Sequence, residues 1–229
     1  MLKADMHSHL LPGIDDGSPS IETSVQLVRG MMNLGYTKLI TTPHILWDMY
    51  RNTSAIIKEK LEILRTAIKS EGLNVEIHAA AEYFLDDHVE GMIRKGEPLL
   101  PISGNMVLVE FSMAHPSMSL KDILFEMQMQ GYQPIIAHPE RYLYLEHHKD
   151  FYDELKDIGC YFQLNLLSLT NHYGKSAHEL AQYLIKKGYY DLVGTDLHHA
   201  RHLEALANPS LAAPLKKLLD SGKIKNAQL

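Results

Sequence analysis

Short apolar stretches alternate along the chain with longer segments in which apolar residues recur every three or four positions. The short stretches are typical of buried strands, and the longer segments are typical of amphipathic helices. Seven stretches predict strands, at residues 2–10, 37–42, 75–82, 106–111, 133–138, 161–165 and 191–196. Helical spacing predicts helices near residues 18–35, 54–70, 85–95, 119–130, 149–158 and 176–187. In the first helix we expect Ser18 as the N-cap, Pro19 as the first helical residue and Gly35 at the end.

This alternation favours a parallel sheet, either closed into a barrel with the helices outside or left open with helices on both faces. A polar side chain that can bind a metal ion lies at or just beyond the end of each predicted strand. These side chains are His7 with His9, His44, Glu82, Glu110, His138, Asn165, and Asp196 with His198. The carboxyl ends of barrel strands meet at one mouth, whereas an open sheet spreads them along an edge. We therefore expect a barrel of about seven strands.

Length and composition narrow the class of protein. A chain of 229 residues, 45% hydrophobic and 22% charged, can bury one core, so we expect one domain over residues 1–229, with two domains as the alternative. Neither a long apolar run nor a charged-then-apolar leader is present, and the single cysteine fits a reducing compartment, so we expect a cytoplasmic protein without membrane insertion. The net charge of −6 argues against broad nucleic-acid binding.

Nine residues at or near the strand ends have metal-binding side chains, five of them histidines and four of them carboxylates. They are His7, His9, His44, His138, His198, Asp16, Glu82, Glu110 and Asp196. One ion takes roughly four to six ligands, so this number of donors predicts at least two ions. Two divalent cations would neutralise the four carboxylates, and a third would leave positive charge that suits an anionic substrate. Imidazole and carboxylate without thiolate indicate manganese, iron, zinc or cobalt ahead of calcium or magnesium.

Several metal ions in one site favour hydrolysis of a phosphoester, because they activate water and hold both oxygens of an in-line displacement. Two arginines follow the metal-binding motifs closely, Arg141 in "HPER" and Arg201 in "DLHHAR". A guanidinium can hold phosphate oxygens in a bidentate way, so both are candidates for phosphate contact, with a solvated surface position as the alternative. Cys160 does not indicate a cysteine phosphatase, since position 166 of a Cys-x5-Arg loop would be Leu166.

Six motifs occur in order along nearly the whole chain: "HSHLLPGIDDG" at 7–17, His44, "AEY" at 81–83, "VEF" at 109–111, "HPER" at 138–141 and "GTDLH" at 194–198. Together they resemble the polymerase-and-histidinol-phosphatase (PHP) superfamily, and within it the manganese-dependent protein-tyrosine phosphatases of bacterial capsule and exopolysaccharide loci. The resemblance implies an α/β fold, a distorted (β/α)7 TIM-like barrel of PHP type. It also implies three metal ions, with manganese ahead of iron, cobalt, zinc or magnesium, and a phosphotyrosine-bearing tail of a bacterial tyrosine kinase as the substrate.

Carried over position by position, the family pattern assigns ligands to the three ions. It makes His7, His9, Glu82, Glu110, His138 and Asp196 ligands of two ions, while Asp16, His44 and His198 hold the third. Of the two acidic residues in "DDG", Asp16 matches the family ligand, and Asp15 is expected to support a ligand or a turn. Arg141 and Arg201 match positions that bind phosphate. The segment "ILWDMYRN" after His44 departs from the basic, histidine-rich stretch of some members.

Three alternatives stay open. Another PHP phosphoesterase would act on histidinol phosphate or a similar small phosphomonoester, and a non-catalytic module would keep its metal and only bind the kinase tail. Trp47 and Tyr50 could contact the phosphotyrosine ring, or could only cover the barrel rim. The other histidines are expected to be surface or packing residues: His78, His88, His115, His147, His148, His172, His178, His199 and His202.

Overall fold

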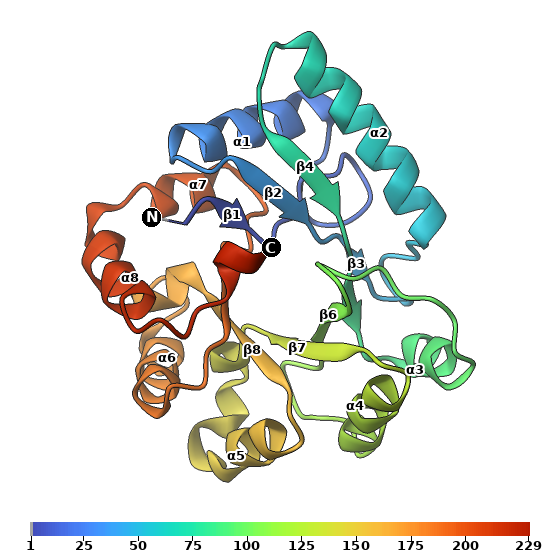
Figure 1. The fold of residues 1–229 in the computed structure, drawn as a ribbon, viewed down its shortest axis with the longest axis vertical. Coiled ribbons are helices and arrows are strands. Elements are labelled where there is room, and N and C mark those ends of the chain that lie inside the picture. The colour runs from blue at the N-terminus through green and yellow to red at the C-terminus, as the bar shows by residue number, and fades with distance from the viewer. Residues whose placement is uncertain (1) are drawn as a thin grey trace.

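The computed structural model describes residues 2–229, which form a ring of parallel strands with helices outside it (Figure 1). The strands are β1 (Ala4–Asp5), β2 (Lys38–Thr41), β3 (His44–Ile45), β4 (Glu76–Ala79), β5 (Glu82–Phe84), β6 (Met106–Glu110), β7 (Gln133–Ala137), β8 (Tyr161–Asn165) and β9 (Leu192–Gly194). They form one sheet in the order β1-β2-β4 and another in the order β3-β5-β6-β7-β8-β9, with every strand pair parallel. The predicted distorted barrel is confirmed.

The predicted strand bounds are wrong at three places. Of the predicted strand 2–10 only β1 (Ala4–Asp5) forms, with Ser8 in an isolated bridge. The segment 75–82 breaks into β4 and β5, and β3 follows β2 as a separate strand that the sequence did not indicate. Pro43 lies between β2 and β3, and proline cannot donate to a backbone ladder. The two sheets meet again on the other side, where Ser8 bridges Leu197 and the backbone nitrogen of His9 donates to the Leu197 oxygen at 2.8 Å. Seven strand positions therefore surround the barrel, two of them split.

All six predicted helices form, and two more follow near the carboxyl end. They are α1 (Ile21–Asn33), α2 (Ser54–Ser70), α3 (Asp87–Arg94), α4 (Leu120–Met129), α5 (Asp150–Asp157), α6 (Lys175–Lys187), α7 (Ala200–Leu206) and α8 (Ala212–Leu219). The predicted N-cap of α1 is wrong: Ser20 accepts from the Thr23 nitrogen, whereas Ser18 lies in the preceding loop and its nitrogen donates to the His9 oxygen. None of the helices within residues 2–229 is long and apolar enough to cross a membrane.

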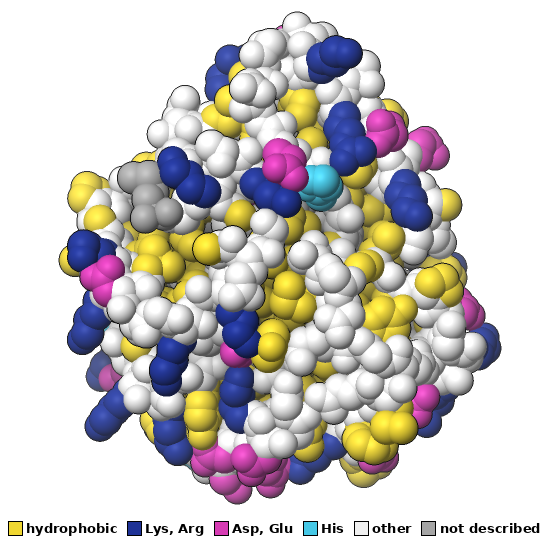
Figure 2. Space-filling model, viewed as in Figure 1, with side chains coloured by type: hydrophobic (Ala, Val, Ile, Leu, Met, Phe, Trp, Pro, Cys, Tyr) yellow, Lys and Arg dark blue, Asp and Glu magenta, His cyan; other side chains and the backbone are white. Residues whose placement is uncertain are grey.

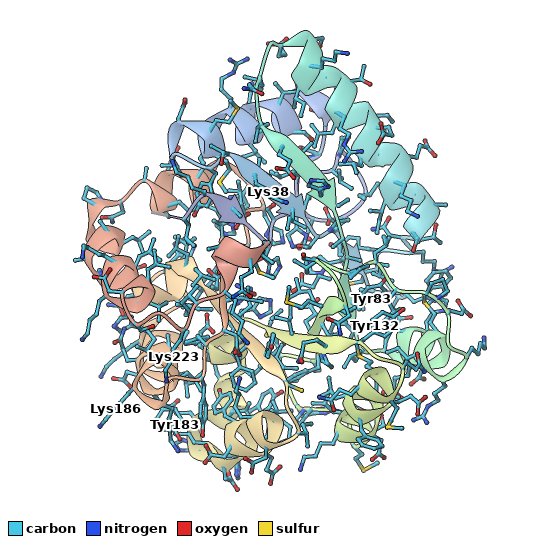
Figure 3. All side chains as sticks on the ribbon, in the orientation of Figure 1. Lys38, Tyr83, Tyr132, Tyr183, Lys186 and Lys223 are labelled. Carbon is cyan, nitrogen blue, oxygen red and sulfur yellow. The ribbon has the colours of Figure 1, made fainter. Side chains whose placement is uncertain are left out.

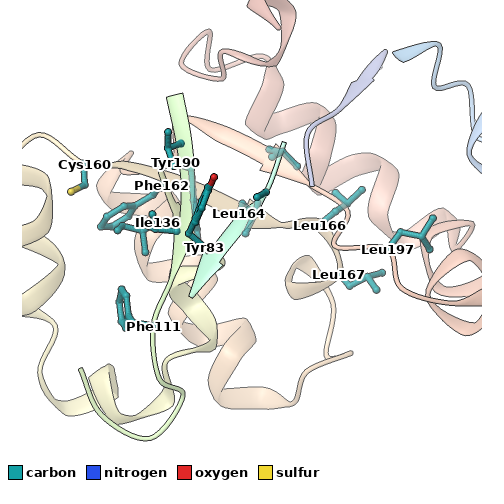
Figure 4. Close-up of a cluster of buried hydrophobic side chains, with 14 of the residues drawn as sticks. Tyr83, Phe111, Ile136, Cys160, Phe162, Leu164, Leu166, Leu167, Tyr190 and Leu197 are labelled. Atoms are coloured by element: carbon teal, nitrogen blue, oxygen red, sulfur yellow. The ribbon is translucent and has the colours of Figure 1, made fainter. Parts of the chain in front are cut away.

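Two apolar cores hold the ring and its helices together. The larger lies between strands and helices, and Figure 4 shows part of it, including Cys160 and Tyr83. The smaller fills the ring itself with residues such as Met6, Ile40 and Leu108. The hydroxyl oxygens of Tyr83 and Tyr132 (Figure 3) accept from the backbone nitrogens of Leu100 and Leu99, at 2.7 and 3.1 Å. Cys160 is fully buried in the larger core.

The last described residues cover the amino ends of the strands, where the C-terminus lies near the centre of the ring (Figure 1). Here the 3-10 helix η5 (Asn226–Gln228) carries a buried asparagine. The Asn226 amide accepts from the Val193 nitrogen at 2.8 Å and donates to the oxygens of Val193 at 2.7 Å and Ala4 at 3.4 Å. Its side chain therefore joins β9 to β1 at the end where no backbone ladder pairs these two strands within residues 2–229.

We expect Asn226→Ala to lower the free energy of unfolding by about 1–3 kcal/mol, because it leaves buried backbone groups without partners. Urea denaturation followed by circular dichroism measures this change. Gln228→Ala is the matched control, since Gln228 lies in the same 3-10 helix with an exposed side chain and should change stability by less than about 0.5 kcal/mol. Equal effects of the two substitutions would show that the Asn226 amide does not close the barrel.

Candidate metal centre

The structure brings together all nine side chains that the sequence predicts as metal ligands. They form four overlapping groups, in each of which the donor atoms lie within 4.8 Å of one another. The groups are His9, Asp16, His44 and His198; His7, His9 and Glu82; His7, His138 and Asp196; and His44, Glu82 and Glu110. Parallel strands place their carboxyl ends at one mouth, which is why residues so distant in sequence meet. The opposite face, in Figure 2, shows lysine and arginine around its edge and almost no histidine.

Glu82, at the start of β5, lies at the centre of this cluster. Its Oε2 atom is 3.1 Å from His7 Nε2, 3.2 Å from His44 Nδ1 and 3.4 Å from His9 Nε2. Its Oε1 atom is 3.2 Å from His138 Nε2. One fully buried carboxylate thus faces four imidazoles, an arrangement in which it could bridge two cations.

Several donor atoms of this cluster are not satisfied by hydrogen bonds to one another, as expected for a site that binds a metal ion. Glu82 Oε2, His44 Nδ1 and His138 Nδ1 are buried and make no hydrogen bond of acceptable geometry within residues 2–229, although Glu82 Oε2 and His44 Nδ1 lie only 3.2 Å apart. Buried polar atoms are almost always paired, so orphaned ligand atoms in one cluster indicate that a cation satisfies them. The mixture of imidazole and carboxylate, with no thiolate, is the donor set of manganese, iron, zinc or cobalt.

The backbone is strained at two of these positions. Within residues 2–229, His138 (φ 33°) and Asp196 (φ 52°) are the residues other than glycine with positive φ. A side chain at positive φ costs free energy that the surrounding structure must offset, and such residues cluster at functional sites. At both positions the chain leaves the end of β7 or β9, and the left-handed turn keeps the side chain at the mouth instead of continuing the strand.

The charges of the cluster shift the pKa values of its members strongly. Burial alone would lower the pKa of His44, but the Glu82 and Glu110 carboxylates together outweigh it and raise the pKa to about 9. Burial opposes a high pKa at His9 too, and the Asp15 carboxylate still raises the His9 pKa well above its ordinary value. A hydrogen bond from His198 lowers the pKa of Asp16 to about 2. The raised pKa values of His9 and His44 favour the protonated imidazoles in the metal-free protein, and a bound cation would displace those protons.

Residues outside the nine donors orient the imidazoles. Asp15 Oδ2 lies 2.8 Å from His9 Nδ1, as expected for a supporting residue, while Asp16 belongs to a donor group. Gln163 Oε1 lies 2.9 Å from His7 Nδ1, which assigns the hydrogen to Nδ1 and leaves Nε2 facing Glu82. We did not predict Gln163 from the sequence. The signal was present, however, because Gln163 is a polar residue inside the buried strand "YFQLN".

We expect Gln163→Leu to weaken manganese binding roughly 10- to 100-fold, because it removes the partner that fixes the His7 tautomer. Isothermal titration of the metal-free protein measures the affinity. Gln182→Leu is the control, since Gln182 is exposed on α6 and should leave the affinity unchanged. Wild-type affinity in Gln163→Leu would show that the His7 orientation does not depend on this contact.

The two predicted phosphate-binding arginines occupy different environments. Arg141, in the 3-10 helix η1 (Pro139–Arg141), donates from Nη1 to Asp196 Oδ2 at 2.7 Å. It lines a hollow of about 230 Å³ beside the cluster, together with Asp16, Tyr173, Asp196, His198, His199 and His202. Arg201 is exposed on α7 and is not among the residues that line this hollow. Phosphate contact by Arg201 stays a prediction.

Most of the remaining histidines are surface or packing residues, as expected, but two of them line the hollow. His78 is exposed and pairs with Glu76 at 2.6 Å, and His178 bonds to the Ser168 oxygen. His199 and His202, however, line the hollow beside Arg141, which the sequence pattern did not indicate. Burial lowers the pKa of His202 to about 4.

The amino-acid sequence matches one family model, and the relatives that it resembles are named tyrosine-protein phosphatases. Residues 3–218 match the family model "Capsular polysaccharide synthesis, CpsB/CapC". The chain is 31% identical to the tyrosine-protein phosphatase CpsB of Streptococcus pneumoniae over 201 residues, covering 85% of this chain and 82% of that protein. It is 26% identical to the tyrosine-protein phosphatase YwqE of Bacillus subtilis over 197 residues, covering 86% of this chain and 78% of that protein.

Solved structures share the fold. A crystal structure from work on YwqE of B. subtilis and CpsB of S. pneumoniae, described as metal-dependent tyrosine phosphatases, superposes with a TM-score of 0.81. Sequence identity is 23%, and the match covers 97% of this chain and 94% of that chain. A putative histidinol phosphatase from Listeria monocytogenes superposes with a TM-score of 0.52 at 10% identity, covering 90% and 98% of the two chains.

Proposed function

The chain belongs to the CpsB/CapC family of capsular polysaccharide synthesis, and from this premise we propose that it is a metal-dependent protein-tyrosine phosphatase. The observation that carries the proposal is the meeting of nine histidine and carboxylate side chains beside Arg141 at the barrel mouth. The names of its relatives CpsB and YwqE support phosphotyrosine as the substrate. One phosphatase domain of PHP type over residues 1–229, in the cytoplasm, is part of the proposal.

The nine donors are proposed to hold three metal ions, with manganese ahead of iron, cobalt, zinc or magnesium. Two ions would take His7, His9, Glu82, Glu110, His138 and Asp196, and the third would take Asp16, His44 and His198. The grouping of donor atoms supports this division, since one group holds Asp16, His44 and His198 with His9. When bound, such ions polarise phosphoryl oxygens and lower the pKa of water.

The chain's own residues position the substrate in this proposal. Arg141 would hold phosphoryl oxygens with guanidinium nitrogens other than Nη1, which Asp196 already engages. Burial opposes the charge on Arg141, yet the Asp196 carboxylate raises the Arg141 pKa, so this cation persists at any physiological pH. The proposed protein substrate is the phosphotyrosine-bearing tail of a bacterial tyrosine kinase that controls capsular or exopolysaccharide synthesis.

Metal analysis joined to an activity screen tests the proposal. Protein loaded with manganese should hydrolyse a phosphotyrosine peptide faster than a phosphoserine peptide or histidinol phosphate, and a chelator should abolish turnover. Cys160→Ser is the control, because a buried thiol outside the mouth should leave the rate unchanged. Preference for histidinol phosphate would replace the proposed substrate, and binding of the peptide without turnover under any metal would leave only a binding module.

A further inference from the structure

Arg141 is held in a fixed orientation at the inner end of the hollow. Its Nη1 atom donates to Asp196 at 2.7 Å, and its guanidinium carbon lies 4.7 Å from the centre of the Tyr173 ring. The ion pair with Asp196 and the cation–π contact with the Tyr173 ring together restrict rotation of the guanidinium. Its other nitrogens have no hydrogen-bond partner within residues 2–229, so they can receive a phosphoryl group.

The Tyr173 ring is fixed in turn. Its hydroxyl oxygen accepts from Asn165 Nδ2 at 3.1 Å, and the same amide donates to Asp196 Oδ2 at 2.9 Å. Asn165 is fully buried at the end of β8, so the ring is anchored to the barrel although it lines the hollow. A phenol ring held at its hydroxyl forms a rigid aromatic wall next to the arginine.

His202 extends this aromatic wall, because its ring lies edge-on to the Tyr173 ring with the ring centres 6.4 Å apart. Its ring centre lies 4.0 Å from that of His199 and 5.4 Å from that of His172, with the His172 ring edge-on. Its Nδ1 atom accepts from the His198 nitrogen at 3.4 Å. Neighbouring rings and the start of α7 therefore hold His202 in place, and the ring needs little further ordering when a ligand packs on it.

The aromatic residues after β3 are engaged within the chain. His88 stacks on the Trp47 indole with ring centres 3.6 Å apart and planes 12° apart, and the Arg51 guanidinium lies 5.9 Å over the same indole. Tyr50 stacks on His44 with ring centres 5.8 Å apart. None of Trp47, Tyr50 and His88 lines the hollow beside Arg141.

We infer that the ring of the substrate phosphotyrosine binds in the hollow against the wall that Tyr173 and His202 form together, with its phosphoryl group on Arg141. This inference rests on the proposed function and adds the position of the substrate ring to it. The hollow, about 230 Å³, has two aromatic rings in its wall beside one cation, which suits an aryl phosphate and offers an alkyl phosphate only the cation. Tyr173 and His202 are thus assigned as specificity-determining residues.

Affinity for two competing anions tests the assignment without turnover. We would titrate the manganese-loaded protein with phenylphosphonate and with methylphosphonate, and compare the ratio of the two affinities among variants of equal manganese content. His202→Asn keeps an acceptor for the His198 nitrogen but removes the ring, and we expect it to weaken phenylphosphonate roughly three- to tenfold. It should change methylphosphonate less than twofold. His202→Phe restores the ring and should restore the phenyl preference.

A second pair of variants keeps the test decisive if His202→Asn fails to load manganese. Tyr173→Leu should lower the phenyl preference, and Tyr173→Phe should preserve it, because phenylalanine retains the ring beside Arg141. Trp47→Ala tests the other position for the ring and should leave the preference within twofold of wild type. Loss of phenyl preference in Trp47→Ala, or its persistence in both His202→Asn and Tyr173→Leu, would overturn the inference.

The outcomes also separate this inference from the proposed function. A protein that prefers phenylphosphonate through His202 but hydrolyses no phosphotyrosine peptide would keep the ring position and lose the proposed activity. A protein that hydrolyses the peptide with an unchanged KM in His202→Asn would keep the activity and lose the ring position.

Discussion

Replacing Glu82 by glutamine should lower kcat/KM for a phosphotyrosine peptide by at least about 10³-fold, which corresponds to roughly 4 kcal/mol of barrier. Glu82 is the carboxylate that four imidazoles face, with His7 Nε2 at 3.1 Å and His138 Nε2 at 3.2 Å. Glutamine has nearly the same shape, so packing survives while the negative charge at the centre is lost. Without this charge the cluster would offset less cationic charge, and because Glu82 belongs to two donor groups the protein should bind fewer ions per chain.

Two measurements check this prediction, the manganese content of the purified variant and its steady-state rate. Glu76→Gln is the matched control, because Glu76 is an exposed glutamate on β4 that pairs with Lys38 and His78. It should retain wild-type metal content and rate. Full metal content and activity in Glu82→Gln would mean that the cluster binds its ions without a central carboxylate.

Manganese affinity should rise steeply with pH between about 6 and 9, because each metal ion must displace protons from histidines. In the metal-free protein the Glu82 and Glu110 carboxylates together overcome the effect of burial and raise the pKa of His44 to about 9. Asp15 raises the pKa of His9 well above its ordinary value in the same way. For each histidine that must lose a proton, the apparent manganese affinity rises about tenfold per pH unit while the pH is below the pKa of that histidine. Two such histidines therefore give a rise of roughly 100-fold per pH unit.

Calorimetric titrations in buffers of different ionisation enthalpy count the protons that are released. At pH 7 we expect at least two protons per fully loaded protein. His78→Asn, which removes an exposed histidine outside the cluster, should leave the count unchanged. Metal binding that is independent of pH would show that these histidines are neutral in the metal-free protein.

The same pKa shifts set the pH range in which the metal-free protein is most stable. The folded pKa of His44 is raised, so its contribution is full below about 6.5 and is lost as the pH rises through about 9. The folded pKa of Asp16 is lowered, so its contribution is present above about 3.8 and is lost as the pH falls through about 2. The folded pKa of His202 is lowered to about 4, so its contribution is full above about 6.5 and declines as the pH falls below that value. Metal-free protein should therefore unfold at the highest temperature near pH 6.5, and added manganese should move this maximum upward.

The sequence indicated the architecture because an apolar residue recurs in the sequence wherever its helix or strand turns a side chain toward the core. In α2, Ile57, Leu61, Leu64 and Ile68 are buried on the face that their spacing predicts, and Thr53 caps the helix. Elements too short to show a period were missed: β3 has two residues, and β4 and β5 are separated by a break inside one apolar run. The α1 cap was misplaced because Ser18 and Ser20 are equally good caps by residue type, and only the contact of Ser18 with His9 separates them.

Residue type and position at strand ends were enough to propose the nine donors, because parallel strands bring their carboxyl ends together. Sequence alone could not indicate how the donors are oriented, since orientation depends on residues that act through another side chain. Gln163 and Tyr173 carry no ligand or phosphate motif, yet they contact His7 and Arg141. Asn165 was expected as a strand-end side chain that can bind a metal ion, but it lies in none of the donor groups and instead donates to Asp196. Nor could periodicity indicate the positive φ of His138 and Asp196, which long-range packing imposes.

What the sequence by itself determined is therefore the barrel, its helices and the chemistry available at its mouth, because these follow from local periodicity and side-chain type. Tertiary structure alone decided which atoms meet: Glu82 among the imidazoles, Arg141 against Tyr173, and Trp47 against His88 instead of the hollow. Those contacts join residues far apart in the chain, and their geometry is set by the closure of the ring and the packing of its loops.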